Sequence, residues 1–188
     1  MKSPFSLCLL LYGALVYTEN TTKKHKVPFH KRFYSDLFRM RSIVILGQVP
    51  HNANRFSIRL CVKKDCIPNV ALLFNPRFIE RKTVMARKMG QSWSNIQVEK
   101  VNPFSKGQRF QMVINIRTLD YEIYINNKYF AKYPQNYLHW EIGYINVRED
   151  VTIDEIQEIS QELVLHHTLQ PGVKVRWDAT ISDAEFKM

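Results

Sequence analysis

The sequence lacks the short motifs that mark the common catalytic sites. It contains no Gly-x-Ser-x-Gly elbow, no phosphate-binding glycine loop and no zinc-binding helix motif. The carboxylates of Glu99, Asp120 and Glu122 would form a glycosidase pair only at a suitable separation, which a sequence does not give. We therefore expect a protein that is not an enzyme and that uses no cofactor.

Cysteine is scarce, with three in 188 residues. The close pair Cys61 and Cys66 has no further ligand at a spacing that suits a metal ion. The adjacent His166 and His167 would point to opposite faces of a strand, so no metal site is expected. If Cys8 is removed with an N-terminal signal, the remaining pair can form a disulfide across a short turn. In a cytosolic protein the two would stay free thiols.

Long apolar runs are absent as well. The stretch from residue 5 to residue 16 is too short to cross a bilayer as a stable helix, so we expect no transmembrane segment in the mature chain. It follows Lys2 and has the length of a secretory hydrophobic region, which predicts a signal peptide over residues 1–18 and a polar linker over 19–26. Asn20 begins a glycosylation acceptor in that linker. The alternative is an apolar N-terminal segment that is disordered or packed.

The sequence is rich in short runs of alternating aromatic and β-branched residues, and no long stretch repeats apolar residues at helical spacing. Each run supplies one apolar row to a core, because successive strand residues point to opposite faces. Asn126 and Asn127 suit a tight turn with positive φ. Such strands must close as a sandwich or a barrel, so the class is all-β. The predicted core comprises Phe56, Ile58, Leu72, Phe74, Phe78, Phe110, Met112, Ile114, Ile123 and Ile125.

One run, Ala-Leu-Leu-Phe-Asn-Pro-Arg-Phe from residue 71 to residue 78, carries polar side chains suited to a ligand. Alternation predicts one buried row, Val70, Leu72, Phe74 and Phe78, and one outward row, Ala71, Leu73, Asn75 and Arg77. The amide and the guanidinium lie one pleat apart, where both can reach adjacent hydroxyls of a sugar. The alternative is that Asn75 supports the turn around Pro76 and that Arg77 is a solvated strand residue.

This run resembles the galectin family, whose fourth strand commonly reads His-Phe-Asn-Pro-Arg-Phe. Further segments follow in the family's order: Val27-Pro28-Phe29, Ile43 to Gly47, Arg55 to Leu60, Trp93, Asn102-Pro103-Phe104 and Gly107 to Phe110. The resemblance covers residues 27–158 and implies a two-sheet antiparallel jelly-roll sandwich, galectin-like and concanavalin A-like. Residues 159–188 form a tail, in which residues 169–176 look like the opening of another galectin domain. The tail is interpreted either as a remnant of a second repeat or as an edge strand or loose segment.

The resemblance also implies a galactose site on Asn75, Arg77 and Trp93, with the Trp93 indole packed against the sugar ring. Four positions that galectins use for polar contacts carry apolar residues here: Leu73 for the histidine, Ala86 for an asparagine, Ile96 for the glutamate and Val98 for a second arginine. A slip of one residue, produced by a bulge near Trp93, would instead present Arg87, Gln97 and Glu99 beside it. The alternative is that Trp93 belongs to the core.

Acidic residues are outnumbered, 17 against 27 lysines and arginines, which gives a net charge of +10. A basic groove attracts anions, and arginine can fork to sulfate or carboxylate. The alternative is that the charge only keeps the protein soluble. No recognised nucleic-acid motif is visible, so no nucleic-acid partner is expected. The candidate carbohydrate-binding residues are Asn75, Arg77, Trp93, Arg81, Arg87 and Gln97.

These patterns favour a galectin-like lectin that recognises galactoside-containing glycans or glycoconjugates, with altered specificity for anionic, sulfated or sialylated forms. The alternative is a galectin-fold protein-interaction module that has lost sugar binding and presents an apolar face. Galectins typically lack a signal and leave cells by other routes. We therefore expect an extracellular protein, exported by a signal peptide or by non-classical secretion; a cytoplasmic location is the alternative.

Overall fold

The computed structural model describes residues 25, 27–33, 42–135 and 142–159. The expected signal peptide, Cys8, the Asn20 acceptor and the tail after Ile159 lie outside the described residues. The described part of the chain has no helix that is both long and apolar enough to cross a lipid bilayer.

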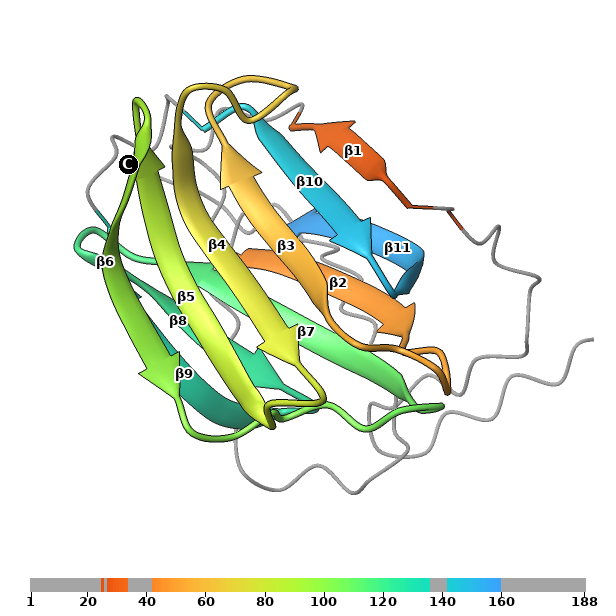
Figure 1. The fold of residues 1–188 in the computed structure, drawn as a ribbon. Helices are drawn as coiled ribbons and strands as arrows, with labels where there is room; N and C mark the ends of the chain where they lie inside the picture. The colour runs from red at the N-terminus through yellow and green to blue at the C-terminus, as the bar shows by residue number, and fades with distance from the viewer. Residues whose placement is uncertain (1–24, 26, 34–41, 136–141, 160–188) are drawn as a thin grey trace, which may run out of the picture. The chain divides into compact units, whose positions relative to one another are not determined.

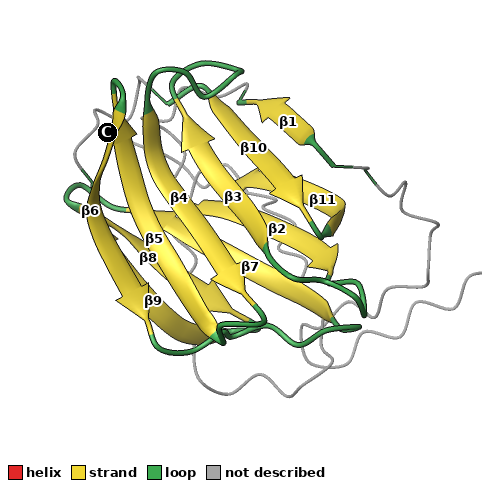
Figure 2. Cartoon of the chain, viewed as in Figure 1, coloured by secondary structure: helices red, strands yellow, loops and turns green. Residues whose placement is uncertain are grey.

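The described strands form two antiparallel sheets, and Figure 1 shows the larger one in front of the smaller. The six-stranded sheet has the order β1 (Phe29–Arg32), β10 (Tyr144–Glu149), β3 (Phe56–Cys61), β4 (Val70–Arg77), β5 (Lys82–Met89) and β6 (Ser92–Glu99). The five-stranded sheet has the order β11 (Thr152–Ile159), β2 (Ser42–Gln48), β7 (Arg109–Ile116), β8 (Asp120–Ile125) and β9 (Lys128–Pro134). Figure 2 shows strands joined by loops and turns throughout the described residues.

One hydrophobic core lies between the two sheets. Phe56 of β3 packs against Phe104 and Phe110, with ring centroids 5.1 and 5.9 Å apart, so aromatic contacts join the layers. Every predicted core residue is buried except Phe78, which is partly buried against the same cluster. The all-β class and the two-sheet sandwich are therefore confirmed.

Two predicted loop features are present. Cys61 and Cys66 are joined by a disulfide, with their Cα atoms 5.0 Å apart, and this bond closes the loop after β3. Asn126 and Asn127 connect β8 to β9 with φ angles of 50° and 65°, a backbone region that asparagine tolerates better than most residues.

A β-bulge near the start of β4 changes the expected alternation. The register shifts between Val70 and Leu73, and Ala71 and Leu72 both join the main core. Val70 packs in a separate cluster with Cys61 and Cys66. The prediction that Val70 belongs to the core row and Ala71 to the outward row is therefore wrong, because a bulge inserts one residue that the simple alternation does not count.

A second bulge lies in β6, where the pairing with β5 shifts between Met85 and Arg87. Asn95, within this bulge, has a φ of 49°. β6 is also an edge strand of its sheet, and bulges are common at sheet edges, where they disrupt the open ladder. This bulge sets which side chains lie beside Trp93.

Candidate functional site

The positions of the candidate residues are described relative to the outer face, which is the side of the six-stranded sheet that points away from the five-stranded sheet. Directly paired residues of antiparallel strands share a face. Asn75 pairs with Val84, which pairs with Val98, and Leu73 pairs with Ala86. Phe74 and Met85, which are also paired, lie in the core between the sheets. The first set therefore lies on the outer face.

We call the part of this face formed by β4, β5 and β6 the galactoside half, after the resemblance described above. Its outward residues are Leu73, Asn75 and Arg77 from β4, Lys82, Val84, Ala86 and Lys88 from β5, and Trp93, Ile96 and Val98 from β6. Asn75, Arg77 and Trp93 are thus on one face, as the resemblance implies. Leu73, Ala86, Ile96 and Val98 share it, so the apolar replacements lie among the retained polar residues.

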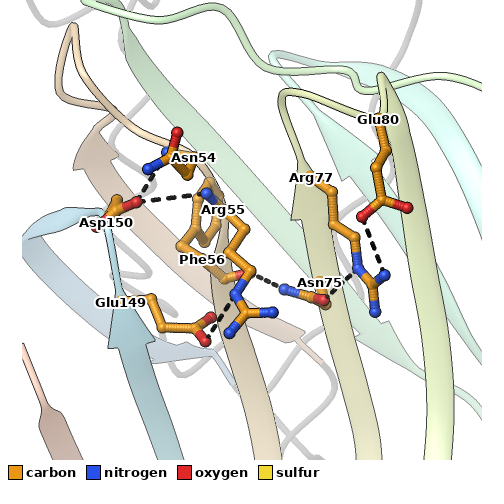
Figure 3. Close-up of polar contacts among 8 residues, drawn as sticks. All are labelled: Asn54, Arg55, Phe56, Asn75, Arg77, Glu80, Glu149 and Asp150. Atoms are coloured by element: carbon orange, nitrogen blue, oxygen red, sulfur yellow. Dashed lines mark hydrogen bonds and ion pairs between the residues drawn. The ribbon is translucent and has the colours of Figure 1, made fainter.

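A chain of hydrogen bonds fixes the two polar residues of β4 (Figure 3). The Asn75 Nδ2 donates to the Phe56 carbonyl at 2.5 Å, and its Oδ1 accepts from the Arg77 Nε at 2.9 Å. The Arg77 Nη1 donates to the Glu80 Oε1 at 3.1 Å. Asn75 is 6% exposed. The amide and the guanidinium are therefore held in one orientation before any ligand arrives, which lowers the entropic cost of binding.

Charges in this half are partly neutralised by Glu80, in the turn between β4 and β5. Its carboxylate also forms an ion pair with Lys82. Hydrogen bonds first from Lys82 and then from Arg77 lower the pKa of Glu80 below its ordinary value. Arg81 is exposed in the same turn with a φ of 50°. Arg81 therefore lies at one end of the galactoside half, beyond the last residue of β4.

The edge strand β6 presents an apolar platform. Trp93 is 42% exposed, Ile96 63% and Val98 48%. A large, exposed indole on a sheet can pack against the C–H face of a pyranose ring and remove water from both surfaces. The platform is also suited to an apolar protein partner.

Arg87 and Gln97 lie on the other side of the sheet. Gln97 pairs with the core residue Met85, and its Nε2 donates to the Glu99 Oε1 at 2.8 Å and to the Lys132 carbonyl of β9 at 3.3 Å. Arg87 pairs with Ser94 and donates to its Oγ at 3.3 Å. The slipped register proposed from the sequence is thus wrong, because the bulge in β6 keeps Ile96 and Val98 outward and turns Gln97 inward.

Arg87 instead belongs to a polar cluster between the sheets. Tyr133 of β9 is fully buried and donates from its hydroxyl to the Asn95 carbonyl at 2.9 Å. Burial raises the pKa of Tyr133, which the hydrogen bond to Asn95 and the charge of Arg87 partly oppose. Arg87 therefore acts on the interior rather than on the outer face. Among the described residues, no group of His, Cys, Asp or Glu side chains could hold a metal ion.

Sequence reasoning missed the other part of the outer face. Arg59 of β3 pairs with Leu73 on one side and with Asn146 of β10 on the other, and Ser57 pairs with Arg148. The signal was present in the run Arg55 to Leu60, where Phe56, Ile58 and Leu60 form the buried row and leave Ser57 and Arg59 outward.

The family to which the fold and the site point is confirmed by comparison with known proteins. The family model for galactoside-binding lectins matches residues 28–158, and the chain belongs to this family. A 32 kDa beta-galactoside-binding lectin of Caenorhabditis elegans is 25% identical over 135 residues, which cover 72% of this chain and 47% of that protein.

Two further relatives agree. A 32 kDa beta-galactoside-binding lectin of Haemonchus contortus is 27% identical over 72% of this chain and 47% of its own length. Galectin-6 of Mus musculus is 28% identical over 69% of this chain and 43% of its own length. The chain therefore spans about half the length of these relatives.

Proposed function

We propose that the chain is a lectin that binds galactoside-containing glycans on the galactoside half of its outer face. The observation that carries the proposal is that Asn75, Arg77 and Trp93 lie on one face, with the amide and the guanidinium held by hydrogen bonds and the indole exposed. Trp93 packs against the sugar ring, and the remaining donors of Asn75 and Arg77 bind its hydroxyls. The names of the relatives support the sugar class. Nothing in the proposal requires a catalytic step.

The apolar positions support an altered specificity. Leu73, Ala86, Ile96 and Val98 supply no hydrogen bond, and each bond lost to a neutral sugar removes about 0.5–1.5 kcal/mol of net binding free energy. Affinity for lactose is therefore weak. No residue assigned to the galactoside half is acidic, and the net charge of the chain is +10. These charges favour sulfated or sialylated galactosides over neutral ones.

Isothermal titration with lactose and with sulfated lactose tests the proposal. We expect Trp93→Ala to abolish measurable binding of both sugars. Tyr129→Ala is the matched control, because Tyr129 is an aromatic residue, 52% exposed, on β9 of the other sheet. Equal binding by the wild type and by Trp93→Ala would overturn the proposed site.

A second candidate function is a protein-interaction module, which the exposed apolar residues of β6 favour. In that case Ile96→Glu would abolish binding of the protein partner. A glycan array probed with the wild-type domain separates the two functions, since a module that has lost sugar binding gives no signal on any galactoside.

We also propose an extracellular site of action. The disulfide between Cys61 and Cys66 supports this location, because such bonds persist mainly in oxidising compartments. Intact-mass analysis of the protein recovered from the medium of eukaryotic cells tests it. Two alkylatable thiols in that material, or no protein in the medium, would argue for the cytoplasm.

A further inference from the structure

Two connections between strands of the six-stranded sheet meet at one end of it, and we call them together the disulfide tip. They are the loop over residues 62–69, between β3 and β4, and the turn over residues 89–92, from the end of β5 to the start of β6. The Gly90 N–H donates to the Asn69 Oδ1 at 3.0 Å, which joins the loop to the turn. Figure 1 shows both connections at the upper end of the front sheet.

The loop of the disulfide tip is held by several contacts. The disulfide joins Cys66 to Cys61 of β3, and both sulfur-bearing residues are buried in one small cluster. The Cys66 N–H donates to the Lys63 carbonyl at 3.0 Å, and the Ile67 N–H donates to the Asp65 Oδ1 at 3.0 Å. The loop therefore presents the residues on either side of Cys66 in a fixed arrangement.

The disulfide tip exposes one large apolar side chain from each of its two connections. Ile67 of the loop is 60% exposed and Met89 of the turn is 54% exposed. Neither packs into a hydrophobic cluster of the described residues. Single exposed apolar residues are common on protein surfaces and indicate no partner by themselves. The kind of partner therefore has to be inferred from the charges that surround Ile67 and Met89.

These surrounding charges are mainly positive. Lys63 and Lys64 are exposed in the loop, and neither takes part in an ion pair with a described residue. Lys88 leads directly into the turn at Met89. The acidic residue of the loop, Asp65, already accepts a hydrogen bond from the backbone. The tip therefore combines exposed apolar side chains with positive charge that is available to a negatively charged partner.

The opposite end of β4 lacks this combination. The turn between β4 and β5 exposes Ile79, at 76%, but Glu80 of the same turn forms ion pairs with Arg77 and Lys82. Figure 3 shows the contact between Glu80 and Arg77. An exposed isoleucine there lies beside cations that are largely neutralised. Ile79 is therefore a matched control for Ile67, since both are exposed isoleucines in connections of the same sheet.

A surface of this size and chemistry fits a membrane better than a folded protein. A specific protein interface buries about 800 Å² on each partner, which is more than one loop and one turn can offer. Membrane contact needs only a few apolar side chains among the lipid headgroups, with basic residues attracted to anionic lipids.

We infer that the disulfide tip docks on anionic lipid membranes. Ile67 and Met89 insert among the headgroups, and Lys63 and Lys64 contact their negatively charged groups. The inference goes beyond the proposed function, because this contact involves no sugar. Trp93 is the direct cross-strand partner of Lys88, the residue before Met89. A chain docked by its tip therefore holds one end of the galactoside half beside the membrane surface.

Sedimentation of the full chain with lipid vesicles that carry no sugar tests the inference. The probes are vesicles of phosphatidylcholine alone and vesicles of an equal mixture of phosphatidylcholine and phosphatidylserine. We expect the partition coefficient to be at least about tenfold larger for the anionic vesicles at low salt, and to fall as salt screens the lysines. Equal partitioning to the two kinds of vesicle would overturn the inference.

Substitutions at the tip test its two components separately. Ile67→Ser combined with Met89→Ser should lower partitioning to the anionic vesicles by about tenfold or more, because less apolar surface is inserted. Lys63→Gln combined with Lys64→Gln should lower it by about tenfold through the lost charges. Ile79→Ser should leave it within about twofold of the wild type. Partitioning that either tip variant leaves unchanged, or that Ile79→Ser lowers as much, would overturn docking by the tip.

Further measurements separate this inference from the proposed function and from an acidic protein partner. The variant with Ile67→Ser and Met89→Ser should bind lactose within about twofold of the wild type in isothermal titration. Lactose binding without vesicle binding overturns docking by the tip and leaves the proposed function standing, whereas vesicle binding without binding of any galactoside does the reverse. Binding to polyglutamate as tight as binding to the anionic vesicles would assign the tip to acidic proteins and overturn the membrane inference.

Discussion

The two halves of the outer face differ in whether their buried polar groups are hydrogen-bonded. In the galactoside half, Asn75 and Arg77 are tied to a backbone carbonyl and to Glu80. We call the part formed by β1, β10 and β3 the basic half, because its outward residues include arginines and no acidic residue. In the basic half, Arg59 and Ser57 keep buried atoms unsatisfied among the described residues. A satisfied cluster holds its shape without a ligand, whereas an unsatisfied one gains most when a ligand arrives. The polar groups of the first half are therefore held in place before a ligand arrives, whereas those of the second still have hydrogen-bonding capacity to offer one.

Both halves of the outer face depend on the core beneath them. A substitution that disrupts this core should therefore destabilise both halves together. Phe74 lies directly behind the border between the two halves, fully buried, with its ring 5.9 Å from that of Phe130 and 6.2 Å from that of Phe104. We expect Phe74→Ala to lower the free energy of unfolding by about 3–5 kcal/mol. Urea denaturation followed by circular dichroism measures it. Leu119→Ala, at a site 75% exposed, should change it little, and equal effects would contradict the proposed core.

A smaller loss of stability is expected when only the hydrogen bonds of Asn75 in the galactoside half are removed. Asn75→Ala leaves the Phe56 carbonyl and the Arg77 Nε without their partner, which should cost about 1–3 kcal/mol of unfolding free energy. Asn69→Ala is the control, since Asn69 accepts from the Gly90 N–H at an exposed site, and it should cost less. If the two variants were equally stable in urea, the buried hydrogen bonds of Asn75 would not hold this half.

The fold could be predicted because alternation and turn residues are local signals. Phe56, Ile58 and Leu60 mark one buried row, and Asn126 and Asn127 mark a turn, independently of the rest of the chain. The bulge in β4 could not be predicted, since an extra residue leaves the apolar content of the strand unchanged. A bulge near Trp93 was raised from the sequence, but its effect on the faces of β6 was not. Asn95 tolerates the positive φ of the β6 bulge, but an asparagine alone does not identify a bulge in a sequence.

The placement of Asn75, Arg77 and Trp93 on one face was predictable, because the resemblance fixed their positions. Gln97 was misplaced because the bulge in β6 reverses the faces of the residues beyond it. Arg87 faces inward by simple alternation along β5, where Val84 and Ala86 point outward. Arg59 lies outside the predicted site because the run from Arg55 to Leu60 indicates only a buried row of Phe56, Ile58 and Leu60. Its position beside Leu73 depends on the pairing of β3 with β4, which no local pattern encodes.

Two substitutions can restore polar residues at positions where the resemblance expects contacts to a neutral sugar. Leu73→His together with Ala86→Asn restores the residue types that the resemblance places at this cross-strand pair. Two added hydrogen bonds should tighten lactose binding by about tenfold, measured by isothermal titration after circular dichroism has shown an unchanged fold. Val84→Thr, on the same strand, is a control with a hydroxyl at a different position. A folded double variant with unchanged lactose affinity would show that these positions do not contact the sugar.

The smallest expected effect concerns the charge balance of the galactoside half. Because Lys82 and Arg77 bond its ionised form, Glu80 should titrate below its ordinary pKa. A depressed pKa means that this contribution to stability is present above the ordinary pKa and is lost as the pH falls through the folded value. Lys82→Met and Arg77→Met should each raise the pKa of Glu80, since each removes a hydrogen bond to its ionised form. Carboxyl NMR titration measures both shifts, with Lys128→Gln as a distant control. An ordinary pKa for Glu80 in the wild type would contradict the ion pairs of Glu80 with Lys82 and Arg77.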